Sequence, residues 1–340
     1  MLLPVLLLAY GATSATGATN TFRAYRTYSA GGGVITPPYT IQVYDLEAAD
    51  GSLTPKGDVL ANVTGAITPA STQAPTALIN NSIAVIPAQV YHSGTAPLTA
   101  LAAIDLKASG TAPAVWTLPT TQPFFGVQYS PKDDLIFMLG AVRAGAGDQM
   151  QAYSLHTHGQ GMTKLATATM TTRIGLTGAN AFDVDNRKLY IVVGTEAPAY
   201  APSLFTYDVA ANTLTQGVIN AENLEIVELG VASDGTLHAV AANMSTSALP
   251  QVVLGTIDPS TGKFSIGATV GAAGSAPSRI YRGTCHFDQE KKEWWSLMEY
   301  ADEDFSRLLH IDAATGTVLD DYSFEENWHD WDPYGCLKLE

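Results

Sequence analysis

Charged residues are scarce in this chain, since Asp, Glu, Lys and Arg together make up 14% of its 340 residues. Basic residues are the scarcer kind: 17 Lys and Arg stand against 32 Asp and Glu, and the formal net charge at pH 7 is −15. Binding to nucleic acid or to an anionic membrane requires clustered Lys and Arg. The sequence has no basic stripe, which argues against both classes of partner.

Long apolar runs are also missing, because no stretch reaches the roughly 18 uninterrupted apolar residues of a membrane-spanning helix. A shorter apolar run, Leu2 to Ala9, precedes small residues. This pattern predicts a signal peptide over residues 1–19, cleaved after Ala15 or Ala18, and hence a secreted, extracellular chain without a transmembrane segment. Three N-x-Ser/Thr sequons are consistent with an exported glycoprotein: Asn62, Asn80 and Asn243.

Recognisable catalytic motifs are absent. The sequence contains no G-x-S-x-G elbow, no H-E-x-x-H helix, no phosphate-binding loop, no dinucleotide fingerprint and no sialidase-type aspartate box. No set of nucleophile, base and orienting residue can be assembled from it. An enzyme is therefore not the favoured interpretation.

Turn-forming residues are plentiful, with 30 Gly and 18 Pro. This composition favours many short strands over helices. One pattern occurs six times: an apolar strand ends at a polar residue, and a short turn leads into another strand. The six polar residues recur every 49 to 60 residues, a spacing typical of propeller blades, and are Asp45, Asp105, Ser154, Asp208, Asp258 and Asp312.

Each later copy is preceded by a hairpin whose second strand is apolar on both faces, as in DDLIFMLGAV and NRKLYIVVG. Such a strand fits the middle of a blade packed between two neighbours. We therefore predict an all-β fold, a single six-bladed β-propeller over residues 20–340, with four antiparallel strands per blade, A (innermost) to D. The first repeat has no strand A, and we predict that the C-terminal strand, residues 334–340, supplies it and closes the ring.

The two cysteines test this register. Cys285 lies on the predicted strand A of the sixth blade, and Cys336 on the strand that completes the first. Innermost strands of adjacent blades are neighbours, and paired cysteines are common in exported proteins. We predict a disulfide between them, with two buried free thiols as the alternative.

The repeated aspartates are predicted to cap the C-to-D turns by accepting backbone N–H bonds. The opposite end of the disc, made of B-to-C and D-to-A loops, is the usual place for ligands. Its sixth B-to-C loop is acidic and is a candidate calcium site or a solvated loop, through Asp302, Glu303 and Asp304. The surrounding stretch, residues 299–332, has eleven carboxylates and one Arg.

Charged residues near the starts of the innermost strands form a second candidate site, either a pocket for a polar ligand or a plug of ion pairs: Arg173, Glu225, Glu228, Arg279 and Arg282. His156 and His158 have the spacing of half a metal site or belong to an exposed turn. His286 follows Cys285 on the innermost strand. The NWHDWDPYG segment near the C-terminus is either a metal or sugar contact or an aromatic cover over the seam of the ring.

The copies TIDPSTGKF and HIDAATGTV, with VASDGTLHAV and DVDNRKLYIV, resemble hairpins of the broad propeller class that includes YVTN-type, NHL-type and gluconolactonase- or strictosidine-synthase-like proteins. Resemblance to the gluconolactonase-like enzymes implies an axial divalent metal, for which Asn180 and Glu228 are two candidate ligands. We therefore expect a secreted or cell-surface module that binds a protein, glycan or cation. The alternative is a calcium-dependent hydrolase or lactonase.

Overall fold

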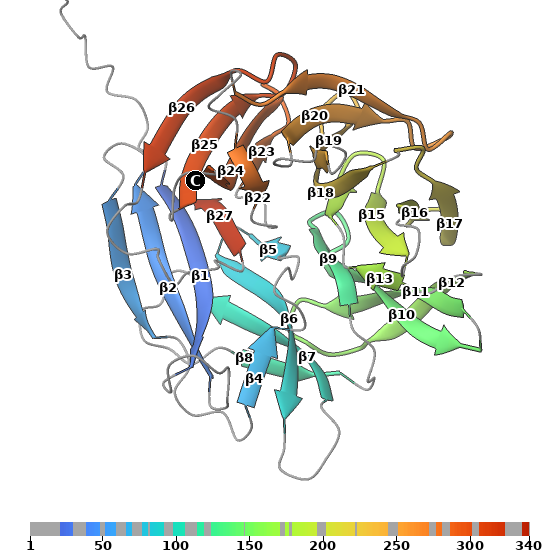
Figure 1. Ribbon diagram of the computed structural model, residues 1–340. Coiled ribbons are helices and arrows are strands. Elements are labelled where there is room, and N and C mark those ends of the chain that lie inside the picture. Colours follow the sequence, from blue (N-terminus) through green and yellow to red (C-terminus); the bar gives the residue numbers. More distant parts are fainter. Residues whose placement is uncertain are drawn as a thin grey trace, which may run out of the picture.

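Figure 1 shows a computed structural model of the chain, in which twisted sheets are arranged around a common centre. It describes residues 21–29, 39–47, 52–58, 66–69, 77–80, 82–91, 98–105, 114–118, 124–145, 147–170, 174–176, 179–195, 202–221, 223–243, 251–271, 277–280, 286–300, 306–323 and 335–339. Every element within these ranges is a strand. Among the described residues, no helix has the length and apolar character needed to cross a membrane.

Five sheets are each formed by one continuous stretch of chain. The first contains β4 (Ala66–Pro69), β5 (Ala77–Ile79), β6 (Ile83–Tyr91), β7 (Leu98–Asp105) and β8 (Ala114–Thr117). The second contains β9 (Phe124–Ser130), β10 (Leu135–Ala144), β11 (Gly147–His156) and β12 (Thr163–Thr169). The third contains β13 (Ile174–Leu176), β14 (Asn180–Asp183), β15 (Lys188–Thr195), β16 (Ser203–Asp208) and β17 (Thr213–Val218).

The fourth sheet contains β18 (Leu224–Val231), β19 (Leu237–Asn243), β20 (Gln251–Ile257) and β21 (Phe264–Thr269). The fifth contains β22 (Pro277–Ile280), β23 (His286–Asp288), β24 (Glu293–Tyr300), β25 (Ser306–Asp312) and β26 (Val318–Ser323). All pairings in these sheets are antiparallel, and in three of them the innermost strand is split in two. The predicted all-β propeller of four-stranded antiparallel blades is confirmed.

A further sheet combines the two ends of the described chain. It has the order β27-β1-β2-β3, from β1 (Thr21–Ser29), β2 (Tyr39–Glu47), β3 (Ser52–Asp58) and β27 (Gly335–Leu339). β27 pairs antiparallel with β1, and Cys336 lies opposite Ala24. The structure thus shows five blades of consecutive strands and not six, because the N-terminal segment contributes only three strands.

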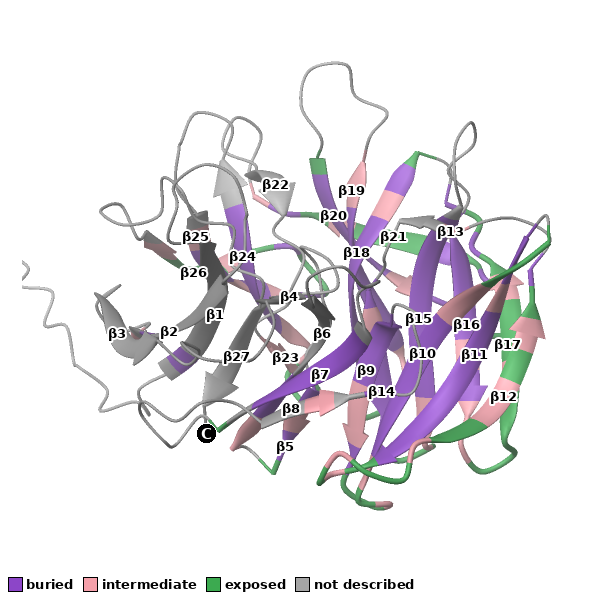
Figure 2. Cartoon of the chain, turned by 90° about the horizontal axis from the view of Figure 1, so that it is seen from below, coloured by how far each residue is buried: buried purple, intermediate pink, exposed green. Residues whose placement is uncertain are grey.

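Middle strands are buried on both faces, as predicted. On β10, Ile136 and Met138 pack in the cluster shared with the β4–β8 blade, whereas Phe137 and Leu139 pack in the cluster shared with the β13–β17 blade. Successive residues of a strand point to opposite faces, which is why one strand contributes to two cores. Figure 2 shows the contrast with the outermost strands β12 and β17, where exposed residues are frequent.

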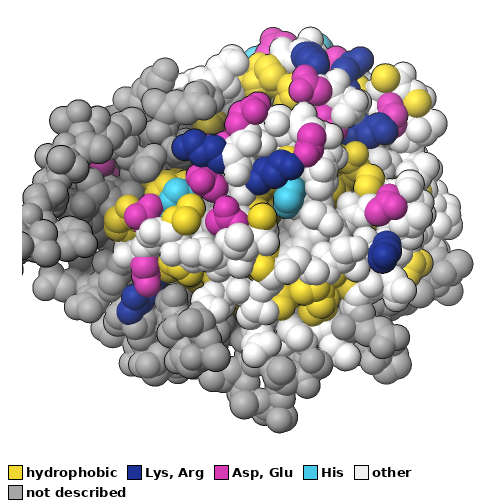
Figure 3. All heavy atoms as spheres, turned by 90° about the horizontal axis from the view of Figure 1, so that it is seen from above, with side chains coloured by type: hydrophobic (Ala, Val, Ile, Leu, Met, Phe, Trp, Pro, Cys, Tyr) yellow, Lys and Arg dark blue, Asp and Glu magenta, His cyan; other side chains and the backbone are white. Residues whose placement is uncertain are grey.

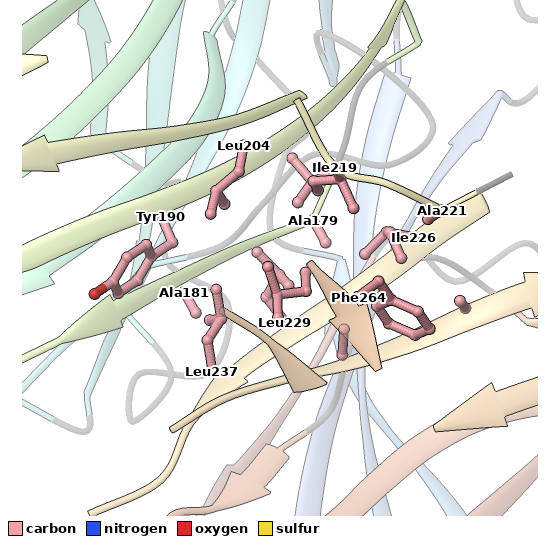
Figure 4. Packing of buried hydrophobic residues seen from close by; sticks show 14 of the residues in the cluster. Ala179, Ala181, Tyr190, Leu204, Ile219, Ala221, Ile226, Leu229, Leu237 and Phe264 are labelled. Carbon is pink, nitrogen blue, oxygen red and sulfur yellow. The ribbon is translucent and has the colours of Figure 1, made fainter. Parts of the chain in front are cut away.

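The core therefore consists of separate clusters, each between two blades. Figure 4 shows the cluster between the β13–β17 and β18–β21 blades, to which Tyr190, Leu204, Leu229 and Phe264 contribute. Full burial of one such side chain stabilises the fold by about 1.5–3 kcal/mol. Blade-to-blade packing is thus the main source of stability, and it holds the strand ends that carry the candidate sites.

Candidate functional site

The repeated aspartates cap the turns that follow strand C in at least three blades, as predicted. Asp258 Oδ1 accepts hydrogen bonds from the Ser260 amide at 2.8 Å and hydroxyl at 2.6 Å. Asp312 Oδ1 accepts from the Thr315 amide at 2.7 Å and hydroxyl at 2.8 Å. Asp208 Oδ1 accepts from the amide of residue 211 at 2.9 Å. These side chains stabilise turns and are not gathered at the centre of the disc.

The bonds to Ser260, side chain first and then backbone, lower the pKa of Asp258 to about 2. The pKa of Asp312 is lowered in the same way by its bonds to Thr315. Hydrogen bonds to the ionised form favour that form. Both carboxylates are therefore charged at neutral pH as part of the turn.

A glycine in each of two such turns fits against the preceding blade. Gly262 has φ +70°, and a Cβ there would lie 2.1 Å from the carbonyl oxygen of Val218. Gly316 has the same φ, and its Cβ would lie 2.4 Å from the carbonyl oxygen of Thr269. Only glycine fits both the left-handed conformation and the close backbone approach. The glycine of the Thr-Gly pair in these two repeats therefore allows the blades to pack closely, a role that the sequence analysis did not assign.

The A-to-B turns at the same end of the disc are linked by bonds between blades. Asp133 pairs with Arg187 of the next blade, with Nε 3.2 Å from Oδ2. Asp234 pairs with Lys292 of the next blade at 2.6 Å, and the pKa of Asp234 is lowered mainly by this bond. Figure 3 shows one side of the molecule on which Lys and Arg side chains lie beside Asp and Glu.

The candidate ligand Asn180 forms a bond between two innermost strands. It lies on β14, and its Oδ1 accepts a hydrogen bond from Gln128 Nε2 of β9 at 2.6 Å. The two strands belong to adjacent blades and are in contact. Asn180 is therefore partly buried and is held by the neighbouring blade.

The candidate ligand Glu228 is buried between two blades. The register of β18 against β19 shifts between Ile226 and Glu228, which marks a β-bulge at Val227. Such bulges redirect side chains. Glu228 is 2% exposed, and its Oε1 accepts a hydrogen bond from Ser296 Oγ of β24 at 2.6 Å. A hydrogen bond to a carboxylate at this depth is strong and holds the two blades together.

Two other predicted site residues lie on described strands. Glu225 is half-buried on β18, and Arg279 lies on β22 opposite Glu299. Several predicted residues lie outside the described ranges: Arg173, Arg282, Asp302, Glu303, Asp304, and residues 327–334 of the NWHDWDPYG segment. The calcium prediction for the acidic loop therefore stays a prediction.

A histidine that the sequence analysis overlooked, His310, forms a polar cluster in the β22–β26 blade. His310 Nε2 lies 2.9 Å from Glu293 Oε2, and its Nδ1 lies 2.9 Å from Asp320 Oδ2. The ring stacks on Trp295 at 4.0 Å and 8°. The sequence held a signal for this cluster in the pairing of the strands. Trp295 lies directly opposite His310, and His310 lies directly opposite Asp320.

The remaining histidines do not assemble a metal site among the described residues. His156 and His158 are exposed and stack at 5.3 Å on the predicted turn. His286 is half-buried on β23. His238 packs against Phe287 at 5.4 Å, and burial lowers its pKa. Within the described ranges, no group of three or more His, Cys, Asp or Glu side chains has a metal-binding arrangement.

Three other predictions fall partly or wholly outside the described residues. Residues 1–19, Asn62 and Cys285 are not described, so the signal peptide, the first sequon and the disulfide stay predictions. Asn80 lies exposed in the turn between β5 and β6. Asn243 is half-buried at the end of β19.

Comparison with known proteins finds similarity at the level of fold. No protein-family model matches the chain, and no curated protein matches it. An apocarotenoid oxygenase mutant from Synechocystis is similar over 88% of this chain and 72% of its own, with 13% identity and a TM-score of 0.52.

Two further solved structures are similar at lower TM-scores. Hydrazine synthase from Kuenenia stuttgartiensis has a TM-score of 0.49 and 10% identity, covering 84% of this chain and 80% of its own. A proposed 6-phosphogluconolactonase from Bacteroides fragilis has a TM-score of 0.47 and 13% identity, covering 96% and 99%. Similarity at such identities concerns the fold alone, and the strand order described above identifies that fold as a β-propeller.

Proposed function

We propose that this chain is a secreted or cell-surface β-propeller that acts as a binding module, with its partner engaging the end of the disc formed by the B-to-C and D-to-A loops. One observation carries the proposal. The opposite end is built from short turns whose side chains are used in bonds between blades, as in the Asp133–Arg187 and Asp234–Lys292 pairs. A rigid scaffold of this kind can present variable loops at its other end.

The proposal includes closure of the ring at the sheet of the chain ends, β27-β1-β2-β3. Pairing of β27 with β1 supports it, as do the contacts of β27 with β23 and of β2 with β4. Phe22 of β1, which is fully buried, packs on Trp295 of β24 with ring centroids 4.9 Å apart. These contacts join the sheet of the chain ends to the blades on both sides. A Cys285–Cys336 disulfide, if formed, would fix this joint covalently.

The partner is proposed to be a protein, a glycan or a cation, and the acidic B-to-C loop makes a cation the first to test. Asp302, Glu303 and Asp304 stand in this loop by sequence. Calcium favours several carboxylate and carbonyl oxygens, which an acidic loop can supply. The strands that flank the loop, β24 and β25, are anchored near it by the buried Met298 and Leu308.

The experiment compares acid-neutralising variants at the two ends of the disc. One variant combines D302N, E303Q and D304N, and the matched control combines D134N, D185N and E290Q at the turn end, which leaves the Asp133–Arg187 and Asp234–Lys292 pairs in place. Calcium binding is measured by calorimetry, and glycan binding on a defined oligosaccharide panel. We expect the loop variant to lose binding at least tenfold and the control to retain it. Binding that survives in the loop variant and fails in the control would contradict the proposal.

A calcium-dependent lactonase is the second candidate, and it depends on Asn180 and Glu228. Both lie on innermost strands of neighbouring blades, β14 and β18, which are in contact. Their present bonds, to Gln128 and Ser296, would have to rearrange for both to hold one metal. Lactone hydrolysis that requires calcium and is abolished by N180A and E228A would favour the enzyme over the binding module.

A further inference from the structure

Of the sequons, the one at Asn80 occupies the most accessible described position. Asn80 lies at the tip of the turn between β5 and β6 with φ +46° and is exposed. Asparagine adopts this left-handed conformation more readily than most residues. The hydroxyl residue of the sequon, Ser82, stands in the same turn, where its amide donates to the Ile79 carbonyl at 3.0 Å.

The neighbouring blade contacts the Asn80 side chain through its oxygen. The hydroxyl of Tyr129, on β9, donates to Asn80 Oδ1 at 3.1 Å and lies 3.2 Å from Asp134 Oδ1. The contact uses the amide oxygen, whereas a glycan is attached to the amide nitrogen. The bond to Tyr129 is therefore compatible with a modified Asn80.

The other described sequon is less suited to a bulky group. Asn243 is the last residue of β19, and its backbone is paired on both sides, with Leu224 of β18 and Gln251 of β20. It is half-buried. N-linked glycans occupy exposed surface positions. The exposed position of Asn80, in an A-to-B turn at the turn end of the disc, meets this requirement, and that of Asn243 meets it less well.

We infer that Asn80 carries an N-linked glycan in the exported chain. The donor is a lipid-pyrophosphate-linked oligosaccharide of the secretory pathway. The Asn80 amide nitrogen forms a bond to the anomeric carbon of that oligosaccharide, the bond from this carbon to the pyrophosphate breaks, and the nitrogen loses one proton. The inference rests on the export included in the proposed function. It extends that proposal, because a glycan at Asn80 requires the turn end of the disc to face solvent.

The experiment follows glycan occupancy in a eukaryotic secretion host. The full chain is expressed with its own residues 1–19 and, separately, with the signal peptide of the host in their place. Glycosidase treatment in ¹⁸O-labelled water marks each formerly glycosylated asparagine, and peptide mass spectrometry identifies the residue. The secreted amount reports on export, and the label reports on glycosylation, so that the two fail separately.

Three variants sharpen the result. S82A removes the sequon and keeps Asn80 and its bond to Tyr129, and we expect it to lose the label at residue 80 completely. Y129F keeps the sequon, and N243Q keeps Asn80, so both should retain the label at residue 80. A chain that is exported with the host signal peptide and is unlabelled at Asn80 would overturn the inference. Label found at residue 243 alone would overturn it equally.

Discussion

Replacing Gly262 with alanine should destabilise the protein by more than its backbone conformation alone would cost. Gly262 has φ +70°, where an L residue costs about 1–2 kcal/mol. The new Cβ would lie 2.1 Å from the Val218 carbonyl oxygen and 3.0 Å from its carbon, which are backbone atoms of the preceding blade. The chain cannot easily retreat, because the Asn220 amide donates to the Gly262 carbonyl at 3.0 Å. Overpacking typically costs about 1–3 kcal/mol more.

The free energy of unfolding of G262A should therefore fall by about 2–5 kcal/mol. Two control variants separate the contributions. Gly145 has φ +69° with nothing within 4 Å of its Cβ, so G145A should cost only about 1–2 kcal/mol. Gly217 has neither constraint, and G217A should change stability by less than about 0.5 kcal/mol. Urea unfolding followed by tryptophan fluorescence measures all three. Equal losses in G262A and G145A would refute the role of blade packing at Gly262.

Three further predictions concern hydrogen bonds and titration. S296A should lower the free energy of unfolding by about 1–3 kcal/mol, because the buried Glu228 carboxylate loses a donor; urea unfolding that matches the unmodified chain would contradict this. Burial lowers the pKa of His238 below its usual 6.5. The free energy of unfolding should therefore be highest above pH 6.5, where the ring is neutral in both states, and should fall as the pH drops from there through the lower pKa of the folded state. H238Q should show a smaller loss between pH 7 and 5 in thermal melts, and equal slopes would argue against a buried neutral ring. NMR titration of Asp258 should give a pKa of about 2 in the unmodified chain and a higher value in S260A, where the hydroxyl donor is lost and the backbone donors remain. The stability that the cap contributes is present above 3.8 and lost as the pH falls through about 2; an unchanged pKa in S260A would contradict the cap.

Much of the architecture was predictable from local pattern. The double-sided apolar strands, such as β10, and the aspartate turns at Asp258 and Asp312 follow from side-chain periodicity and turn chemistry. The role of Gly262 was not predictable in this way, because its partner, Val218, lies in another blade. A single repeat encodes its own hairpin but does not reveal which backbone lies against it.

The candidate site was less predictable than the fold, for a related reason. Glu228 could be assigned to an innermost strand, but the bulge that turns it toward Ser296 is not visible in the residue pattern. His310 was overlooked because its two carboxylate neighbours, Glu293 and Asp320, come from different strands. Side chains whose partners lie on another strand or another blade acquire their roles only from the tertiary structure.

The proposed binding end depends on a closed ring of blades. Amide hydrogen exchange in β27 and β1, the strands that close the ring, tests this closure most directly. The five residues of β27 pair with β1, and Phe22 of β1 packs on Trp295 of the last blade. We expect the β27 amides to exchange as slowly as those of the outer strand β26, and deletion of residues 334–340 to remove protection from β1. If the β27 amides instead exchange at the rate of a free peptide while β18 and β24 stay protected, the ring is not closed by the C-terminal strand.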